Sequence, residues 1–576
     1  MPFDGLMLAA VRHEITPKIT KARIARIYQP DPTTVVLGLR WPDEEHQLLI
    51  STAPNQARIH LVHQPFEPSI FAFGQSLRKS LIGGQVIEIK QPDWDRLLYL
   101  TIETEEGLLE LIAEIMGRHS NLVLVDARTK KILAAQRVVT EQMSRYRQIA
   151  PGLRYIQPPA SGRRPFYPLT REALANVLNS PKQVANTLLQ GLLGLSPLLV
   201  TEILHRSGIE PTTPAQALKA EHVERLLQEL THLGQRAAQG SFTPTLITDG
   251  QGLPADISAT NLKHLDPAVQ KPFPSPSLLV SEYFHFKTTR EAMAQLENQL
   301  NAVIQQQLAN CNQKVVELEE ALHRAESADE FRKYGELLTA NLHALKRGQR
   351  EATVIDYYDP EQRETTIELD PELTPAANAD KYFRMYQKAR RGRRITAEQL
   401  SKVNEEIQYL QTVETHLELA EDLEDLERIR DELMEQGYLP KPSERTKTGK
   451  KAQPLIFRGP EEVPIHVGRN NRENDQLTLR LARPHDLWFH TKQIPGSHVV
   501  VRMERKVGDL ADVPEQLVRC AAQIAAYFSK ARHGQNVPVD YTFIKYVRKP
   551  SGARPGFVIY DHYRTIQVDP KLPERD

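Results

Sequence analysis

The chain has 576 residues, of which 40% are hydrophobic and 25% charged, and its 73 Lys and Arg balance 73 Asp and Glu. This length suits about three or four domains and disfavours a single one. Cys311 and Cys520 are too few for a disulfide framework or a four-cysteine zinc site, which favours a reducing compartment. Early charges disfavour a secretory signal and no run approaches the roughly 20 apolar residues of a membrane span, so a cytoplasmic, non-membrane protein is expected.

The N-terminal part is predicted to be one α+β domain in two pieces, 1–174 and 237–287. An amphipathic helix is expected over 3–15. Strands are predicted at 24–28, 34–39, 47–51, 58–61, 86–89, 97–104, 122–125, 242–247 and 261–265. Between the two pieces, 175–236 is predicted to be an inserted helix-hairpin-helix, because a glycine-rich turn at 191–197 precedes a helix at 198–206. Its turn is expected to point N–H groups outward, as phosphate-binding turns do.

Two segments of the first domain contain more charged and polar side chains than a turn requires. Asp93, Trp94, Asp95 and Arg96 precede the strand at 97–104, and 114–121 joins two apolar strands. The structural alternatives are that 93–96 forms a local ion pair at the start of a strand and that 114–121 is an ordinary connector.

The segment 288–439 is predicted to be a long antiparallel coiled-coil hairpin. Its arms, 288–346 and 380–439, are of nearly equal length, and the compact helical bundle is the alternative. Apolar residues recur at helical spacing at Leu296, Leu300, Ile304, Cys311, Val315, Leu318 and Leu322, and at Leu400, Val403, Ile407, Leu410, Leu419, Leu423, Leu426 and Leu433. The tip, about 347–379, is expected to be non-helical, with a small β-hairpin at 352–358 and 365–369. Basic residues gather just beyond it, from Lys381 to Arg394, which favours an anionic partner near the tip.

The C-terminal region comprises a polar linker at 440–453 and an α+β domain at 454–576. From residue 440 onward the chain holds 24 Lys and Arg against 15 Asp and Glu, and such an excess is typical of nucleic-acid-binding domains. The helix is predicted at 514–531. The strands are predicted at 455–457, 465–467, 488–491, 498–502, 541–547 and 556–560.

Catalytic and metal chemistry find little support. His466, His485, His490 and His498 lack the spacing of a metal motif, and they suit RNA contacts together with Trp488. Ser497 has no nucleophile elbow around it, and there is no phosphate-binding loop or dinucleotide fingerprint. No metal and no cofactor are therefore expected.

Several motifs occur together in one known family. They are 1–5, Asp95 and Arg96, 114–121, Leu373, Thr374, Pro375, Asn378, Ala379, Tyr382, Phe383, 468–475, 486–491 and 494–498. Together they resemble the NFACT family over nearly the whole chain. The resemblance implies an α+β multidomain protein with a glycosylase-like N-terminal domain, the inserted helix-hairpin-helix, the coiled-coil hairpin and a C-terminal RNA-binding domain.

The resemblance also implies a ribosome-quality-control factor. Such a factor binds a large (50S) subunit that still holds peptidyl-tRNA, and recruits alanyl-tRNA for mRNA-independent alanine tailing of the stalled chain. The ribosome forms the peptide bonds, so the protein itself is not an enzyme. Large-subunit rRNA, a ribosomal protein and a small S4-like RNA-binding protein are the further partners implied.

Site residues are carried over position by position. The tRNA-binding residues implied are Asp95, Arg96, Glu114, Met116, Gly117, Arg118, Ser120 and Asn121. Candidate rRNA contacts are Arg469, Asn470, Trp488, His490, Lys492, Ser497, His498, Lys545, Arg548 and Lys549.

Three alternatives stay open. A DNA glycosylase would use Pro2 as its nucleophile, although Phe3 stands where that family has an acidic residue and two cysteines cannot make its zinc finger. A fibronectin-binding adhesin lacks an export signal here. An RNA-binding scaffold without tailing activity is the third.

Overall fold

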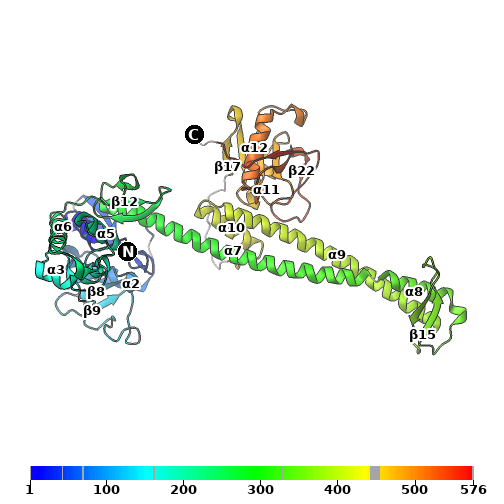
Figure 1. Cartoon of the computed structure of the whole chain (residues 1–576), viewed down its shortest axis with the longest axis horizontal. Coiled ribbons are helices and arrows are strands. Elements are labelled where there is room, and N and C mark those ends of the chain that lie inside the picture. The colour runs from blue at the N-terminus through cyan, green and yellow to red at the C-terminus, as the bar shows by residue number, and fades with distance from the viewer. Residues whose placement is uncertain are drawn as a thin grey trace. The chain divides into compact units, whose positions relative to one another are not determined.

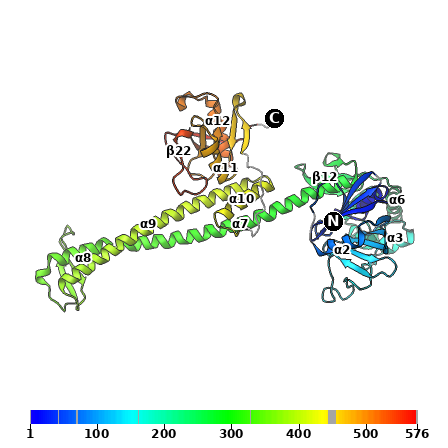
Figure 2. The ribbon, with the colours of Figure 1, turned by 180° about the vertical axis from the view of Figure 1, so that it is seen from behind.

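The computed structural model describes residues 2–41, 43–67, 71–159, 162–326, 328–441 and 454–573. It divides into two compact units, Met1–Arg290 and Glu291–Asp576. Figure 1 shows the ribbon and Figure 2 its reverse side.

A nine-stranded antiparallel sheet organises the first unit. In spatial order its strands are β4 (Arg58–Val62), β3 (Glu44–Ser51), β2 (Thr34–Trp41), β1 (Arg23–Asp31), β5 (Gln85–Lys90), β6 (Leu97–Thr104), β7 (Gly107–Glu114), β8 (Asn121–Asp126) and β9 (Ile132–Ala135). The seven strands predicted between residues 24 and 125 are confirmed, while β7 and β9 were not among the predicted strands. Nearly all neighbours in space are neighbours in sequence, which is why alternation alone located these strands.

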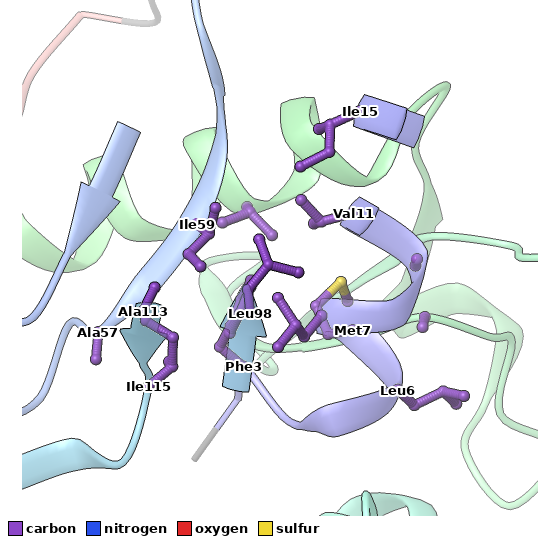
Figure 3. Packing of buried hydrophobic residues seen from close by; sticks show 14 of the residues in the cluster. Phe3, Leu6, Met7, Val11, Ile15, Ala57, Ile59, Leu98, Ala113 and Ile115 are labelled. Atoms are coloured by element: carbon purple, nitrogen blue, oxygen red, sulfur yellow. The ribbon is translucent and has the colours of Figure 1, made fainter. Parts of the chain in front are cut away.

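The first helix, α1 (Gly5–Ile19), is the central helix of this unit rather than the amphipathic surface helix predicted over 3–15. All residues from Gly5 to Val11 are buried. The helix packs against β2, β4 and β5 and also against α6, so it has no broad solvent face. Figure 3 shows Met7, Val11 and Ile15 directed toward Ile59 and Leu98 of the sheet. The prediction of amphipathicity was wrong because two layers cover the helix.

The inserted helices and a second small sheet share the core of this domain. Helix α2 (Ala72–Leu81) belongs to the first piece of the domain, and the helices that follow residue 170 are α3 (Arg171–Leu178), α4 (Val184–Gly191), α5 (Pro197–Ser207) and α6 (Ala220–Ala238). The short strands β10 (Arg164–Pro165) and β11 (Leu192–Leu193) pair in parallel. A three-stranded sheet follows, with β12 (Thr245–Thr248), β13 (Pro254–Ser258) and β14 (Gln270–Pro272). The strand predicted at 261–265 is wrong. The side-chain amide of Gln270 bonds both the N–H and the carbonyl of Leu262, which replaces a strand partner.

Two long helices form the hairpin of the second unit. They are α7 (Pro276–Glu326), which begins in the first unit and has 51 residues, and α9 (Pro375–Leu419), which has 45. Gln305 of the first arm donates to Glu414 of the second arm (2.6 Å). Farther along the first arm, Gly335 of α8 (Ala328–Ala340) lies against the ring of Phe383. Higher residue numbers in the first arm thus face lower numbers in the second, so the arms are antiparallel. Leu300, Ile304 and Leu410 are buried along the seam. The antiparallel hairpin is confirmed, and the compact bundle is excluded.

The second arm is not one continuous helix as predicted over 380–439. Helix α9 begins already at Pro375, capped by Thr374, and ends at Leu419. Asp422 then caps a separate helix, α10 (Leu423–Glu435), whose leucines pack back onto α9 instead of prolonging the arm. The tip holds the expected β-hairpin, with β15 (Glu351–Ile355) paired to β16 (Glu364–Glu368). The linker predicted at 440–453 lies outside the described residues from 442 onward.

The C-terminal domain is a six-stranded sheet with α12 (Glu515–Tyr527) on one face. In spatial order its strands are β17 (Leu455–Arg458), β18 (Pro464–Val467), β20 (Val499–Val501), β19 (Leu487–Thr491), β21 (Val537–Phe543) and β24 (Arg564–Val568). Strand β24 was not predicted, and the strand expected at 556–560 is reduced to β23 (Ile559–Tyr560), which pairs with β22 (Val547–Arg548). Helix α11 (Asn471–Gln476), also not predicted, continues into a π-helical turn, Leu477–Leu481.

Candidate nucleic-acid interfaces

Strand register brings the two polar segments of the first domain to one end of the large sheet. Leu97 of β6 pairs with Glu114 of β7, which in turn pairs with Asn121 of β8. The N–H of Ile115 donates to the carbonyl of Arg96 (2.8 Å). Asp95 and Arg96 therefore lie beside the segment 115–120, although about 20 residues separate them in sequence.

The turn that carries Asp95 and Arg96 is held rigidly. Asp93 and Trp94 both have positive φ (49° and 61°), a conformation that only strong surrounding contacts maintain. The Trp94 ring lies 5.0 Å from Phe166, and its N–H donates to the carbonyl of Tyr167 (2.5 Å). A Cβ on Gly5 would lie 1.9 Å from the Trp94 carbonyl oxygen, so this approach requires glycine.

The helix-hairpin-helix turn completes this packing instead of opening outward. Gly194, at φ 92°, has no room for a side chain beside Trp94 and Phe166, and its carbonyl accepts the N–H of Leu6 (3.2 Å). Ser196 closes the N-terminus of α5 by accepting from Leu199. The turn that was expected to point outward and bind phosphate is thus covered on this side, where it packs against the 93–96 turn.

Two carboxylates, those of Asp95 and Asp4, lie near Arg96. Asp95 accepts the backbone N–H of Arg96 (2.8 Å). Burial lowers the pKa of Arg96, whereas the nearby Asp95 and Asp4 carboxylates act in the opposite direction. Burial also raises the pKa of Asp4, the N-cap of α1, to about 6 from 3.8. A cationic group with two acids beside it and Arg163 nearby has the chemistry of a polar anchor for RNA.

We expect Asp4→Asn to stabilise the first unit at neutral pH. The folded state holds the Asp4 proton up to about pH 6 while the unfolded chain releases it near 3.8, so this contribution to stability is complete below pH 4 and is lost as pH rises through 6. Asparagine still caps the helix. At pH 7.5 the free energy of unfolding of the variant should be about 3 kcal/mol larger than that of the wild type. Denaturant titrations of both proteins at pH 4 and 7.5 measure this, with the exposed cap variant Asp266→Asn as the control.

Four of the predicted tRNA-binding residues position the 115–120 segment from inside. Glu114 is fully buried, and its carboxylate bonds Arg147 and accepts from the Tyr155 hydroxyl (2.9 Å). Ser120 accepts the N–H of Met116 (2.9 Å), and Asn121 bonds the backbone of Arg137 in both directions. Gly117 has φ 61°, which suits glycine. These four residues hold the loop in its shape.

Arg118 is the predicted residue whose side chain is free of the interior. It and His119 are exposed on the 3-10 turn Gly117–His119, and the Arg137 guanidinium donates to the Arg118 carbonyl (2.7 Å). Arg137, Arg147 and Tyr155 were missed by sequence reasoning, since nothing local in sequence links them to this turn. The outer face of the segment is therefore cationic.

In the C-terminal domain, many of the predicted rRNA contacts are held inside the protein. Trp488, Ser497, His498 and Asn470 are at most 3% exposed. Arg469 pairs with Asp425 of α10 (2.9 Å), and Lys549 pairs with Asp475. Motif residues around 469–475 thus join the domain to α10 rather than face solvent.

The remaining cations, Lys492, Lys545 and Arg548, lie at the surface, where Lys492 pairs with Asp540 (3.7 Å) and Arg548 with Asp561 (3.8 Å). Lys492 lies over the Tyr563 ring (5.2 Å), Lys545 lies over Tyr546 (4.8 Å), and Tyr546 stacks on His562 (4.5 Å). We call this the basic–aromatic surface. Its members are Lys492, Lys545, Tyr546, Arg548, His562 and Tyr563. Alternating cations and rings suit single-stranded RNA, and Tyr546, His562 and Tyr563 were not predicted.

The two family models that match this chain meet at residue 453, just before the C-terminal domain begins. A family model described as NFACT N-terminal and middle domains matches residues 4–453, and one described as NFACT protein RNA binding domain matches residues 453–559. The chain is 36% identical over 586 residues to a Bacillus subtilis (strain 168) protein named Rqc2 homolog RqcH, covering 99% of this chain and 98% of that one.

Two solved structures are also similar in part. The C-terminal part of the fibronectin/fibrinogen-binding protein from Streptococcus suis is 32% identical, with TM-score 0.39, over 48% of this chain and 96% of that one. The MutM (Fpg) protein from Thermus thermophilus is 15% identical, with TM-score 0.23, over 42% of this chain and 78% of that one.

These matches define an NFACT protein with that family's RNA-binding domain at its C-terminal end. The chain belongs to the NFACT family, in which the Rqc2 homologue RqcH is a full-length relative.

Among the described helices none is both long and apolar enough to cross a bilayer. Within the described ranges, no three His, Cys, Asp or Glu residues gather as ligands for a metal ion.

Proposed function

We propose that this protein is a cytoplasmic ribosome-quality-control factor. It binds large (50S) subunits that carry peptidyl-tRNA and recruits alanyl-tRNA, so that alanines are added to the stalled chain without mRNA. Family membership supports the general role, since the full-length relative is an Rqc2 homologue. The small S4-like RNA-binding protein is proposed as a partner on the subunit.

The strand register of the first domain is the observation that carries the tRNA part of the proposal. Arg96 and the 115–120 segment lie side by side at one sheet end, with Arg118 exposed there. The Arg96 guanidinium, with acids near it, and the exposed Arg118 guanidinium, which donates to His119 (3.0 Å), can contact phosphates at two points. Two such contacts fix the register of a bound RNA.

The protein's contribution in this proposal is positioning. No side chain of this protein takes part in acyl transfer, because the large subunit forms the peptide bond. The C-terminal domain contacts rRNA and ribosomal protein through the basic–aromatic surface. No cofactor or metal takes part. The DNA glycosylase alternative would need an acid at position 3, where the fully buried Phe3 lies in the core.

We expect Arg118→Glu to abolish most tailing. The assay supplies purified large subunits that carry peptidyl-tRNA, together with alanyl-tRNA, and follows lengthening of the nascent chain by mass spectrometry. Reversing an exposed charge at a phosphate contact should weaken tRNA binding at least about tenfold at moderate salt. Arg128→Glu is the control, because Arg128 is also exposed but follows the opposite end of β8.

The two variants separate the proposal from the scaffold alternative. If Arg128→Glu tails normally and Arg118→Glu does not, the tRNA site lies where the register places it. If the wild-type protein binds the subunits without any lengthening of the nascent chain, the scaffold is correct. Equal loss in both variants would show only a general need for positive charge and would contradict the site.

A further inference from the structure

A pocket of about 510 Å³ opens on the face of the C-terminal sheet opposite α12. Strand β19 alternates, so Leu487 and Phe489 join the core beneath α12 while Trp488 and His490 face the other way. The pocket is lined by Trp488, His490, His498 and Tyr560, by Gln408 and neighbouring residues of α9, and by the loop 553–558. Both α9 and the C-terminal domain belong to the second unit.

Aromatic rings form a rigid floor. The rings of Trp488 and His490 stack at 5.7 Å with an interplanar angle of 8°, His498 meets Trp488 edge-on at 5.2 Å, and Tyr560 lies 4.8 Å from Trp488. Thr478 fixes His498 through its Nδ1 (2.7 Å). The Trp488 N–H is buried and finds no hydrogen-bond partner among the described residues. Trp488 and His498 are only 1% and 2% exposed, so they hold in place the partly exposed rings of His490 and Tyr560 that line the pocket. Rings held in this way are preorganised for a flat ligand.

The charges around the pocket favour an uncharged ligand. Burial lowers the pKa of both His490 and His498, so each imidazole is neutral at physiological pH. Arg554, the cation among the lining residues, is already engaged by Glu406 (3.2 Å) and by the hydroxyl of Tyr438 (2.6 Å). A phosphate would find no uncommitted cation among these described residues, whereas the amides of Gln408, Gln411 and Gln493 offer donors and acceptors.

The pocket adjoins the basic–aromatic surface. Tyr560 of the floor lies 5.3 Å from Tyr563, the ring beneath Lys492, and Gln493 of the lining follows Lys492 directly. An RNA whose phosphates contact Lys492 would therefore pass the mouth of the pocket. RNA is read where bases are unpaired, because an unstacked base can enter an aromatic site.

We propose that this pocket takes one unpaired nucleobase of an RNA, with its phosphates on the basic–aromatic surface. The volume falls within the range of about 300–1,000 Å³ usual for small-ligand sites and suits a nucleoside. The inference rests on the proposed RNA-binding function. It adds that the pocket recognises a bulged or looped base and not a continuous duplex.

Binding of two RNA hairpins tests this inference. One has a fully paired stem and the other has the same stem with a single bulged adenosine. The full-length protein should bind the bulged hairpin about tenfold more tightly. Gln408→Trp, which fills the pocket from a helix position, should remove the difference without changing affinity for the paired stem. Gln399→Trp, exposed on α9 outside the lining, should keep it.

A second pair of variants guards against effects on folding. Phe557 (38% exposed, lining) and Ile559 (39% exposed, not lining) are matched, so Phe557→Ala should weaken binding of the bulged hairpin and Ile559→Ala should not. Equal wild-type binding of both hairpins, or a difference that survives Gln408→Trp, overturns the base pocket and leaves RNA binding intact; the occupant would then be of another class, such as a peptide. Binding of neither hairpin, nor of large-subunit RNA, overturns the proposed function itself.

Discussion

The double variant Asp95→Ala, Arg96→Ala is expected to lose about 100-fold in affinity for alanine tRNA. A charge-assisted hydrogen bond contributes about 1.5–3 kcal/mol, and removing the guanidinium together with the neighbouring acid loses more than one such contact. Equilibrium binding of labelled alanine tRNA to the purified protein, at fixed salt, measures the change. The protein should still bind large subunits, because the basic–aromatic surface is untouched.

The control for this prediction is another acidic and basic pair on the same sheet. Glu110 and Lys130 form an ion pair (2.7 Å) away from the row that joins Leu97, Glu114 and Asn121. The variant Glu110→Ala, Lys130→Ala should keep tRNA affinity within about twofold, since a partly exposed pair contributes little to stability. Thermal unfolding of both double variants checks that the first unit still folds. A folded Asp95, Arg96 variant with unchanged tRNA affinity would remove these residues from the site.

The variant Glu432→Ala is expected to destabilise the second unit strongly. Glu432 of α10 is 1% exposed and accepts three hydrogen bonds. They come from the backbone N–H of Asn471 (3.2 Å), its side-chain amide (3.0 Å) and the hydroxyl of Tyr409 (2.8 Å). Removing the acceptor leaves buried donors without partners, at a cost of about 3 kcal/mol. For a unit of this size the melting temperature should fall by roughly 6–12 °C in calorimetry.

Two further substitutions distinguish the cause. Burial raises the pKa of Glu432. The amide of Glu432→Gln keeps one acceptor oxygen for Tyr409 and Asn471, so this variant should cost less than alanine. Glu435, on the same helix, pairs with Arg472 at the surface with 54% exposure, and Glu435→Ala should change stability by less than about 0.5 kcal/mol. Hydrogen exchange should also accelerate at α11 in Glu432→Ala alone. Similar melting temperatures for Glu432→Ala and Glu435→Ala would contradict this assignment.

The elements that sequence predicted well are those defined by local spacing. Leu300, Ile304 and Leu410 recur at helical intervals because each faces the same seam, so the hairpin arms followed from the pattern. The large sheet followed from period-two alternation between adjacent strands. The break at 420–422 was missed because Leu423 and Leu426 keep helical spacing although α10 folds back onto α9.

The sequence predicted which residues belong to the candidate sites, but it did not predict which of their side chains are buried, paired or exposed. Asp95 and Arg96 stood out by composition, whereas the burial of Glu114 depends on Arg147 and Tyr155, more than 30 residues away. Likewise, Trp488 and Arg469 look like surface contacts in sequence. Only the packing of the second unit reveals that one is covered and the other paired with Asp425. Polar motif residues can thus recognise RNA or hold domains together, and local pattern does not separate the two.

Purifying the full-length protein from cells and sequencing its bound RNA tests the central claim most directly. The account predicts enrichment of alanine tRNA together with large-subunit rRNA, and loss of the tRNA alone in the Asp95→Ala, Arg96→Ala variant. Large-subunit rRNA without any enriched tRNA, or the same tRNA in both proteins, would contradict it.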